Sequence, residues 1–404
     1  MKSFCKNILA LAISSASFST PAFAQEAASI TEAIKAGKAH LHLRFRYEDV
    51  EEDTLEDAAA TTLKTRLTYT SGTYEGFGLT LEMDDTTELG RKDYSDGVTD
   101  RGTATIADPQ VTEVNQAFIS YTKGATTAKY GRQRIILDNQ RFVGGVGWRQ
   151  DEQTYDGFTV ASKPVAGLSL FYGYITDVNR VFAEAADHNH ESHLINAKYE
   201  TPIGSIIGYG YLLENKSAQA LSSNTFGARW QGKAGTYVNY NLEYAQQKEA
   251  GDNPTDYSAD YLLAELNGSI PVATSKIHLG VGYEVLGSDD GRAAFTTSLA
   301  TLHAFQGWAD KFLATPAAGI EDTYFSVGTA FKAVTVSLVY HTYSTDEGDF
   351  DYGDELGFVA ETKVGPVGLT FKYADYTADA AAPAPGVGFT RDTQKLWLMA
   401  AVTF

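Results

Sequence analysis

Hydrophobic and polar residues alternate along many short segments of this chain. Within residues 41–47, leucine, phenylalanine and tyrosine occupy the odd positions, whereas histidine and arginine occupy the even ones. The same period of two recurs in residues 62–69, 238–244 and 369–373. This period is typical of β-strands, whose side chains point to opposite faces in turn. The pattern therefore predicts strands that each have one apolar and one polar face.

Short and long connections alternate between these predicted strands. The short ones lie near residues 71–76, 123–125, 163–167, 201–204, 232–235, 268–273, 332–334 and 364–368. The long ones cover residues 50–60, 85–110, 138–152, 178–190, 215–223, 247–256, 286–321, 345–355 and 377–392. Tight periplasmic turns that alternate with long extracellular loops are typical of outer-membrane barrels. The sequence thus predicts an all-β protein, a transmembrane antiparallel up-and-down β-barrel of about 18 strands.

The last residues of the chain support this fold. Leu396, Leu398, Ala400 and Val402 alternate with other residues up to a terminal Phe404. This ending resembles the last-strand signature by which the barrel assembly machinery recognises outer-membrane barrels; the alternative is an ordinary last strand of a soluble sheet. Because lipid cannot satisfy an open sheet edge, the first strand, near residues 39–49, must pair with the last, near 393–404.

The first residues are typical of an export signal. Lys2 and Lys6 precede a short apolar run, and Ala22-Phe23-Ala24 offers a cleavage site before Gln25. We therefore expect a signal peptide at 1–24, a short periplasmic N-terminal segment at 25–38 and the transmembrane barrel at 39–404, located in the bacterial outer membrane. Partly helical spacing within 25–38 suggests a short periplasmic helix, with a disordered lead as the alternative, and this segment is a candidate plug of the lower mouth.

The composition agrees with this fold and adds a few details to it. The 24 tyrosines, 21 phenylalanines and 37 glycines suit many strands and tight turns. Tyrosines and tryptophans near strand ends are expected to form the aromatic girdles at the two membrane interfaces; they are Tyr121, Tyr174, Tyr199, Trp230 and Trp397. The net charge of −19 lies largely in the loops, describes the rim of the barrel, and gives no support for nucleic-acid binding.

Three segments resemble the alginate-export family of outer-membrane porins. Residues 131–156 begin Gly-Arg-Gln-Arg-Ile-Ile-Leu-Asp-Asn-Gln-Arg-Phe-Val-Gly, and residues 305–315 read Phe-Gln-Gly-Trp-Ala-Asp-Lys-Phe-Leu-Ala-Thr. The opening at 31–38, which leads into Leu43-Arg44-Phe45-Arg46, is similar too. The resemblance implies a monomeric barrel of 18 strands with loops folded into its mouth.

A set of basic residues on inferred lumen faces is the candidate pore lining. Its members are Arg44, Arg46, Lys64, Arg66, Arg132, Arg134, Arg141 and Arg149. Arginine pairs with carboxylates in two-point contacts, and cations in a pore favour anionic solutes. The alternative is that these cations pair with acids of the lumen itself, for which Glu82, Asp138, Asp151, Glu152 and Asp156 are available.

Two other segments are candidate sites. The longest connection, residues 286–321, is expected to fold inward as a gate or constriction, with an external cap as the alternative. His188, His190 and His193 form the one histidine cluster, but they lack the spacing of a hydrolase metal site. We expect no metal and no cofactor.

The function predicted from these features is a porin for passive diffusion of small hydrophilic solutes, with a preference for anions such as acidic sugars or carboxylates. The alternatives are a general non-specific porin and an exporter of an alginate-like polysaccharide. An outer-membrane enzyme is disfavoured because the chain has no Gly-x-Ser-x-Gly elbow. A purely structural barrel is disfavoured by the basic lumen face. Outer-membrane lipid and lipopolysaccharide are the expected surroundings.

Overall fold

The computed structural model of the protein describes residues 26–90, 93–272, 275–379 and 388–404, so the expected signal peptide lies outside the described residues. The barrel consists of β1 (Lys38–Glu52), β2 (Ala58–Thr70), β3 (Phe77–Glu88), β4 (Val111–Lys123), β5 (Thr126–Gln133), β6 (Thr154–Ser162), β7 (Leu168–Asn179), β8 (His188–Thr201), β9 (Gly204–Leu213), β10 (Ser223–Ala234), β11 (Val238–Glu249), β12 (Ser258–Val272), β13 (Ser275–Leu286), β16 (Ile320–Phe331), β17 (Val334–Ser344), β18 (Asp351–Val364), β19 (Val367–Ala378) and β20 (Thr393–Thr403).

A few short elements lie outside the barrel sheet. They are the helix α1 (Ile30–Lys35), the small hairpin of β14 (Ser288–Asp289) and β15 (Ala293–Ala294), and the 3-10 turns at Glu184–Ala186, Gln219–Leu221, Leu302–Ala304 and Gly388–Thr390. No helix among the described residues is both long and apolar enough to span a membrane.

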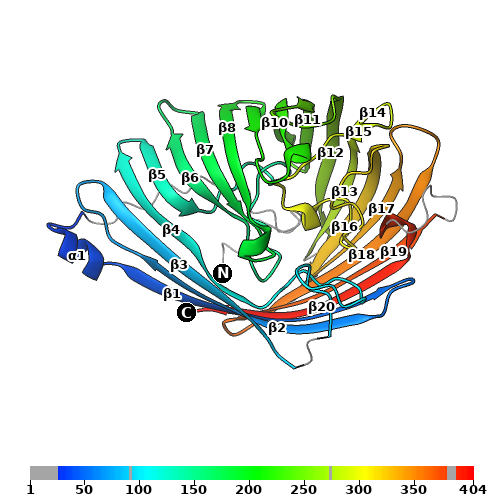
Figure 1. The fold of residues 1–404 in the computed structure, drawn as a ribbon, viewed down its shortest axis with the longest axis horizontal. Helices are drawn as coiled ribbons and strands as arrows, with labels where there is room; N and C mark the ends of the chain where they lie inside the picture. Colours follow the sequence, from blue (N-terminus) through cyan, green and yellow to red (C-terminus); the bar gives the residue numbers. More distant parts are fainter. Residues whose placement is uncertain (1–25, 91–92, 273–274, 380–387) are drawn as a thin grey trace.

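The strands form one closed antiparallel sheet. Each strand pairs with its neighbours in chain order, and β1 pairs with both β2 and β20, for example Phe45 with Leu63 and with Ala400. In Figure 1 the blue β1 and the red β20 run side by side, which closes the sheet. The prediction of an 18-stranded barrel whose first strand pairs with its last is confirmed.

The two faces of the wall differ as the alternation predicts. On β1, Phe45 is 40% exposed, whereas its neighbours Arg46 and Glu48 are at most 1% exposed. The exposed face carries apolar side chains around the barrel and is the face that meets lipid. The covered face points into the lumen, which the external loops fill in large part.

One predicted girdle residue is an exception. Tyr121, Tyr199 and Trp230 are exposed on the outward face, by 38%, 52% and 39%. Trp397 instead is 0% exposed, because it alternates with the outward Leu398 and therefore points into the lumen. The prediction that Trp397 anchors the barrel at an interface is wrong.

The helix α1 packs against the turn between β2 and β3. The backbone N–H of Gly72 donates to Ala33 O at 2.8 Å, and that of Ala27 donates to Thr73 O at 2.8 Å. The hydroxyl of Tyr69, on the outward face of β2, donates to Ile34 O. In Figure 1, α1 lies beyond the start of β1 at the edge of the barrel. The suggestion that this segment plugs the mouth is therefore wrong.

Candidate functional site

Two external loops enter the lumen and meet there. The third loop (residues 134–153) and the seventh loop (residues 287–319) are joined by a parallel bridge between Val143 and Leu299. Gly144 N–H donates to Leu299 O at 2.9 Å, and Thr301 N–H donates to Gln140 O at 3.0 Å. The inward course predicted for residues 286–321 is thus what the structure shows.

Local backbone geometry explains the sharp course of the third loop. Asp138, Gln140 and Val146 have φ values of 50°, 67° and 49°, a region in which the chain reverses tightly. At Gly144 a Cβ would lie 2.3 Å from Thr301 Oγ1, so only glycine permits the close approach of the two loops. The glycine-rich stretch of residues 144–147 therefore serves the contact between the loops.

A cluster of six charged groups joins the third loop to the wall of β2 and β3. Arg134 Nη2 lies 2.8 Å from Glu82 and 2.5 Å from Glu152, and Arg66 lies 2.8 Å from Glu152 and 2.5 Å from Asp84. Lys64 Nζ completes the cluster, 3.1 Å from Asp84. We call this set the charged cluster; it contains Lys64, Arg66, Arg134, Glu82, Asp84 and Glu152.

Exposure within the charged cluster is uneven. The side chains of Arg134 and Arg66 are 24% and 13% exposed. Their carboxylate partners Glu82, Asp84 and Glu152 are 5%, 1% and 9% exposed. The acids are thus better covered than the two arginines.

Arg44 is held differently from the other predicted cations. Its Nε donates to Gln150 Oε1 and its Nη1 to Gly147 O, each at 2.8 Å. Among the described residues no carboxylate forms an ion pair with Arg44, which donates instead to carbonyl and amide oxygens.

Four of the predicted cations are covered by the loops. Arg46 pairs with Asp108 at 2.9 Å, Arg149 with Glu48 at 3.0 Å, and Arg141 with Glu284 at 2.7 Å. The side chains of these three arginines and of Lys64 are at most 7% exposed. They join the second and third loops to the wall, and Arg149 also joins the third loop to Asp310 of the seventh. These side chains offer little surface to a solute.

The position of Arg132 corrects its predicted role in the lumen. On β5 it shares a face with Tyr130, which is 71% exposed and lies opposite the exposed Phe158 of β6. Arg132 lies opposite Asp156 and pairs with it at 2.9 Å. Gln133, the next residue, is the one that points inward and is 2% exposed. The register therefore places Arg132 on the outward face.

The opposite side of the third loop packs on aromatic rings. The ring of Phe142 lies 5.2 Å from Tyr209, 5.2 Å from Tyr261 and 5.8 Å from Phe295, measured between centroids. Phe142 and Phe295 come from the two loops, whereas the tyrosines come from β9 and β12. Apolar burial of this kind fixes the loops against the wall.

The tip of the seventh loop is bound to the wall of β18 to β20. Glu355 accepts hydrogen bonds from the backbone N–H groups of Trp308 and Ala309. Asp310 lies 2.7 Å from His303 and 2.9 Å from Lys395. Although burial favours the neutral acid, these two neighbours hold the pKa of Asp310 well below its usual range.

A lysine that forms no ion pair with a described carboxylate contacts this tip. Lys372 Nζ lies 4.1 Å from the ring centre of Trp148 and 4.0 Å from that of Trp308, in cation–π geometry. It also lies 2.7 Å from His303 Nε2. Trp148 belongs to the third loop and Trp308 to the seventh, so this lysine ties both loops to β19.

The environment of Asp151, in the third loop, favours the protonated form of its carboxyl group. Burial and the neighbouring charge of Glu113 raise the pKa of Asp151 to about 9. Glu82 and Glu152, which were available as partners, do pair with predicted cations, but Asp138 instead accepts from Asn196 at 2.7 Å.

The sequence indicates some of the site residues that the prediction missed, but not others. Glu48 could have been found, because it shares the alternating face of Arg44 and Arg46. Asp108 could not, because it lies in the second loop (residues 89–110), where nothing indicates that it reaches Arg46. No group of three or more metal-binding side chains occurs in the part of the chain that the structure describes.

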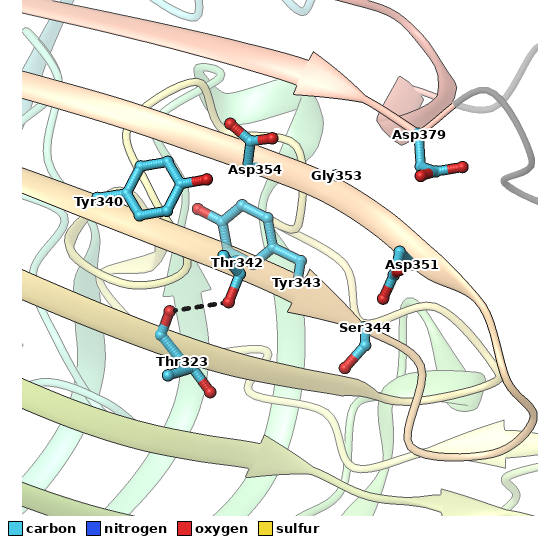
Figure 2. A pocket seen from close by; sticks show the side chains of 9 residues that line it. All are labelled: Thr323, Tyr340, Thr342, Tyr343, Ser344, Asp351, Gly353, Asp354 and Asp379. Carbon is cyan, nitrogen blue, oxygen red and sulfur yellow. Dashed lines mark hydrogen bonds between the residues drawn. The ribbon is translucent and has the colours of Figure 1, made fainter.

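A polar hollow of about 250 Å³ lies away from the lumen path, between β17 and β18. Figure 2 shows Asp351, Asp354 and Asp379 around it, together with the hydroxyls of Tyr340 and Thr342. Tyr340 is 41% exposed on the outward face. Its acids make this hollow unsuitable for anionic solutes.

A closed antiparallel barrel of 18 strands, with an apolar outward face and loops docked inside the lumen, is the architecture of an outer-membrane porin. The chain belongs to the alginate export family, whose family model matches residues 39–264, more than half of the chain. The predicted resemblance and the location in the bacterial outer membrane are confirmed.

Solved structures share the fold at low identity. OpdK of Pseudomonas aeruginosa, determined with vanillate, is 16% identical, with a TM-score of 0.68 over 92% of this chain and 99% of that chain. OccAB2 of Acinetobacter baumannii is 17% identical, with a TM-score of 0.70 over 92% and 99%. OpdG of Pseudomonas aeruginosa is 14% identical, with a TM-score of 0.71 over 92% and 99%. No curated protein matched the chain.

Proposed function

We propose that the protein passes small hydrophilic solutes by passive diffusion and prefers anions, such as acidic sugars and other small carboxylates. The observation that carries this proposal is the uneven exposure of the charged cluster, in which Arg66 and Arg134 cover their acids. Arg44, for which the described part of the chain offers no ion pair, adds a charge on the same side of the lumen. Cations that line a pore lower the energy of an anion inside it.

The docked loops set the size of the solute. Because the third and seventh loops cross the lumen and are pinned on both sides, the remaining space suits small molecules better than a polymer chain. The relatives are consistent with carboxylates: the family is named for alginate, and one matched structure contains vanillate, and both molecules carry carboxylate groups.

A general porin without charge preference is the second candidate. Its support is that the three cations of the charged cluster face three acids, so their formal charges cancel. The two candidates differ in what a small carboxylate does inside the pore, since only a basic path retains it long enough to interrupt the ion current.

The test is single-channel recording in a planar bilayer, with vanillate and glucuronate added in turn. Current blockade by both acids is expected, and it should weaken in Arg134→Gln. The matched control is Arg132→Gln, which removes an outward arginine that pairs with one acid and should leave blockade unchanged. Absence of blockade in the wild type would leave only the general porin.

The remaining features of the proposal concern export and assembly. We expect residues 1–24 to be removed on export, the barrel assembly machinery to insert the chain, and the barrel to act as a monomer. Mass spectrometry of the membrane-inserted protein gives its N-terminus, and its molecular mass in detergent gives the oligomeric state.

A further inference from the structure

The segment before the first strand lies against the outward face of the barrel. Tyr69 alternates with Leu67, which is 53% exposed on the lipid-facing side of β2. Its hydroxyl donates to Ile34 O, and its ring lies directly over Gly37, where an added Cβ would be 2.4 Å from a ring carbon. The chain between α1 and β1 therefore crosses an outward tyrosine and not the lumen.

One face of α1 is used to hold this position. Ala33 is 5% exposed and accepts from Gly72 N–H in the periplasmic turn between β2 and β3. Ser29 caps the helix by accepting from Glu32 N–H at 3.3 Å. The contacts of Ala27, Ala33 and Ile34 with the barrel thus fix the helix to the rim.

The other face of α1 is apolar, and the described residues leave most of it exposed. Ile30 and Ile34 are 64% and 54% exposed, and their spacing of four residues puts both on one side of the helix. Two exposed isoleucines in a helix of six residues are costly in water. Their exposure indicates that this face meets something apolar.

The position of α1 along the barrel wall indicates which apolar surroundings its exposed face meets. Next to the same turn, the outward rings of Phe77 and Tyr121 are 53% and 38% exposed and lie 4.7 Å apart. Outward aromatic residues at strand ends mark the membrane–water interface. Since Tyr69 belongs to this girdle and contacts α1, the helix lies at the level of the lipid head groups.

We propose that α1 is an interfacial anchor, with Ile30 and Ile34 inserted at the boundary between head groups and acyl chains of the periplasmic leaflet. Lys35 and Lys38 follow directly and are exposed, so their ammonium groups can reach the phospholipid phosphates. The anchor keeps the N-terminal segment outside the periplasmic mouth, which leaves the channel exit clear.

Site-directed spin labelling tests this proposal. Cys5 is the single cysteine of the chain, so a Cys5→Ser background allows labels at Ile30→Cys and Ile34→Cys. Thr31→Cys is the matched control, because Thr31 is exposed on the adjacent side of the same helix. The barrel is reconstituted in bilayers of phosphatidylethanolamine and phosphatidylglycerol, and power saturation measures the access of oxygen and of a water-soluble nickel chelate.

The expected result is that the labels at 30 and 34 are reached several-fold better by oxygen than by nickel, and that the label at 31 shows the opposite order. Equal nickel access at all three positions would overturn the proposal. Dipolar broadening confined to 30 and 34 would overturn it as well, because it would show a second copy of the chain on this face. Heat-modifiable migration in gels confirms that each variant is a folded barrel.

Discussion

On the side of the lumen formed by β2 and β3, the third loop meets charged groups, whereas on the side formed by β9 and β12 it meets aromatic rings. Arg134 and Glu152 of the loop join the charged cluster, and Phe142 fills the opposite pocket. Aromatic packing excludes water and fixes the loop in place. Ion pairs at a partly exposed surface leave room for water and for a solute. The aromatic side thus holds the third loop in place, and on the other side the same loop exposes charged groups.

The largest effect is expected from the aromatic side. Phe142→Ala removes a ring that is 8% exposed and contacts four others, at a cost of about 3–5 kcal/mol of docking energy. The third loop should then leave its place, so that single-channel conductance rises and becomes noisy. Phe226→Ala, which removes a ring 58% exposed to lipid, is the control. Unchanged conductance in Phe142→Ala would show that aromatic packing does not hold the loop.

The next effect concerns the centre of the charged cluster. Glu152 contacts Lys64, Arg66 and Arg134, so Glu152→Gln leaves three cations with one acid fewer. Breaking a buried ion pair costs about 3–5 kcal/mol, which should be reduced here because Arg134 keeps Glu82. We expect easier proteolysis of the third loop and stronger anion preference. A shift towards cations would contradict the assignment of Glu152 as the covered partner.

A smaller effect is expected from removing one partly exposed charge. Arg134→Gln takes away a positive charge about 7 Å from a passing ion, which in a hydrated pore is worth about 0.6 kcal/mol, or roughly a threefold change in relative anion permeability. Arg132→Gln should change it little, since its charge lies outside the lumen and is paired with Asp156. Equal effects of the two substitutions would contradict the different faces assigned to them.

The smallest effect should appear only at raised pH. The pKa of Asp151 is raised in the folded protein to about 9, above its ordinary value of 3.8, so folding favours its protonated form. The contribution of protonated Asp151 to folding stability is therefore fully present below pH 3.8 and is lost as the pH rises towards 9. Wild-type channels should therefore become noisier between pH 7 and about pH 9. Channels of Asp151→Asn should show no rise in current noise over this range. Identical noise–pH profiles of the wild type and Asp151→Asn would contradict the raised pKa of Asp151.

The wall of the barrel could be predicted from the sequence because apolar and polar residues alternate within each strand. Phe45 and Arg46, or Leu242 and Glu243, fall on the faces that the period of two assigns. Trp397 is an aromatic residue near a strand end, yet its alternation with Leu396 and Leu398 puts it inside the barrel. In this case the pattern was a better guide than residue type.

The candidate site was less predictable because it depends on where strands end. Arg132 and Arg134 are two residues apart and would share a face if β5 continued, but β5 ends at Gln133 and the chain turns inward. The partners of these arginines come from β3 and β6, and that of Arg46 from the second loop. Such contacts depend on tertiary packing, which no local pattern records.

The reversal potential of single channels in a potassium chloride gradient tests the central claim most directly, because it reports which ion the hydrated side of the lumen favours. We expect a reversal potential on the anion-selective side that moves towards zero in Arg66→Gln and Arg134→Gln. A cation-selective wild type that neither substitution changes would contradict the claim that the partly exposed arginines form the path.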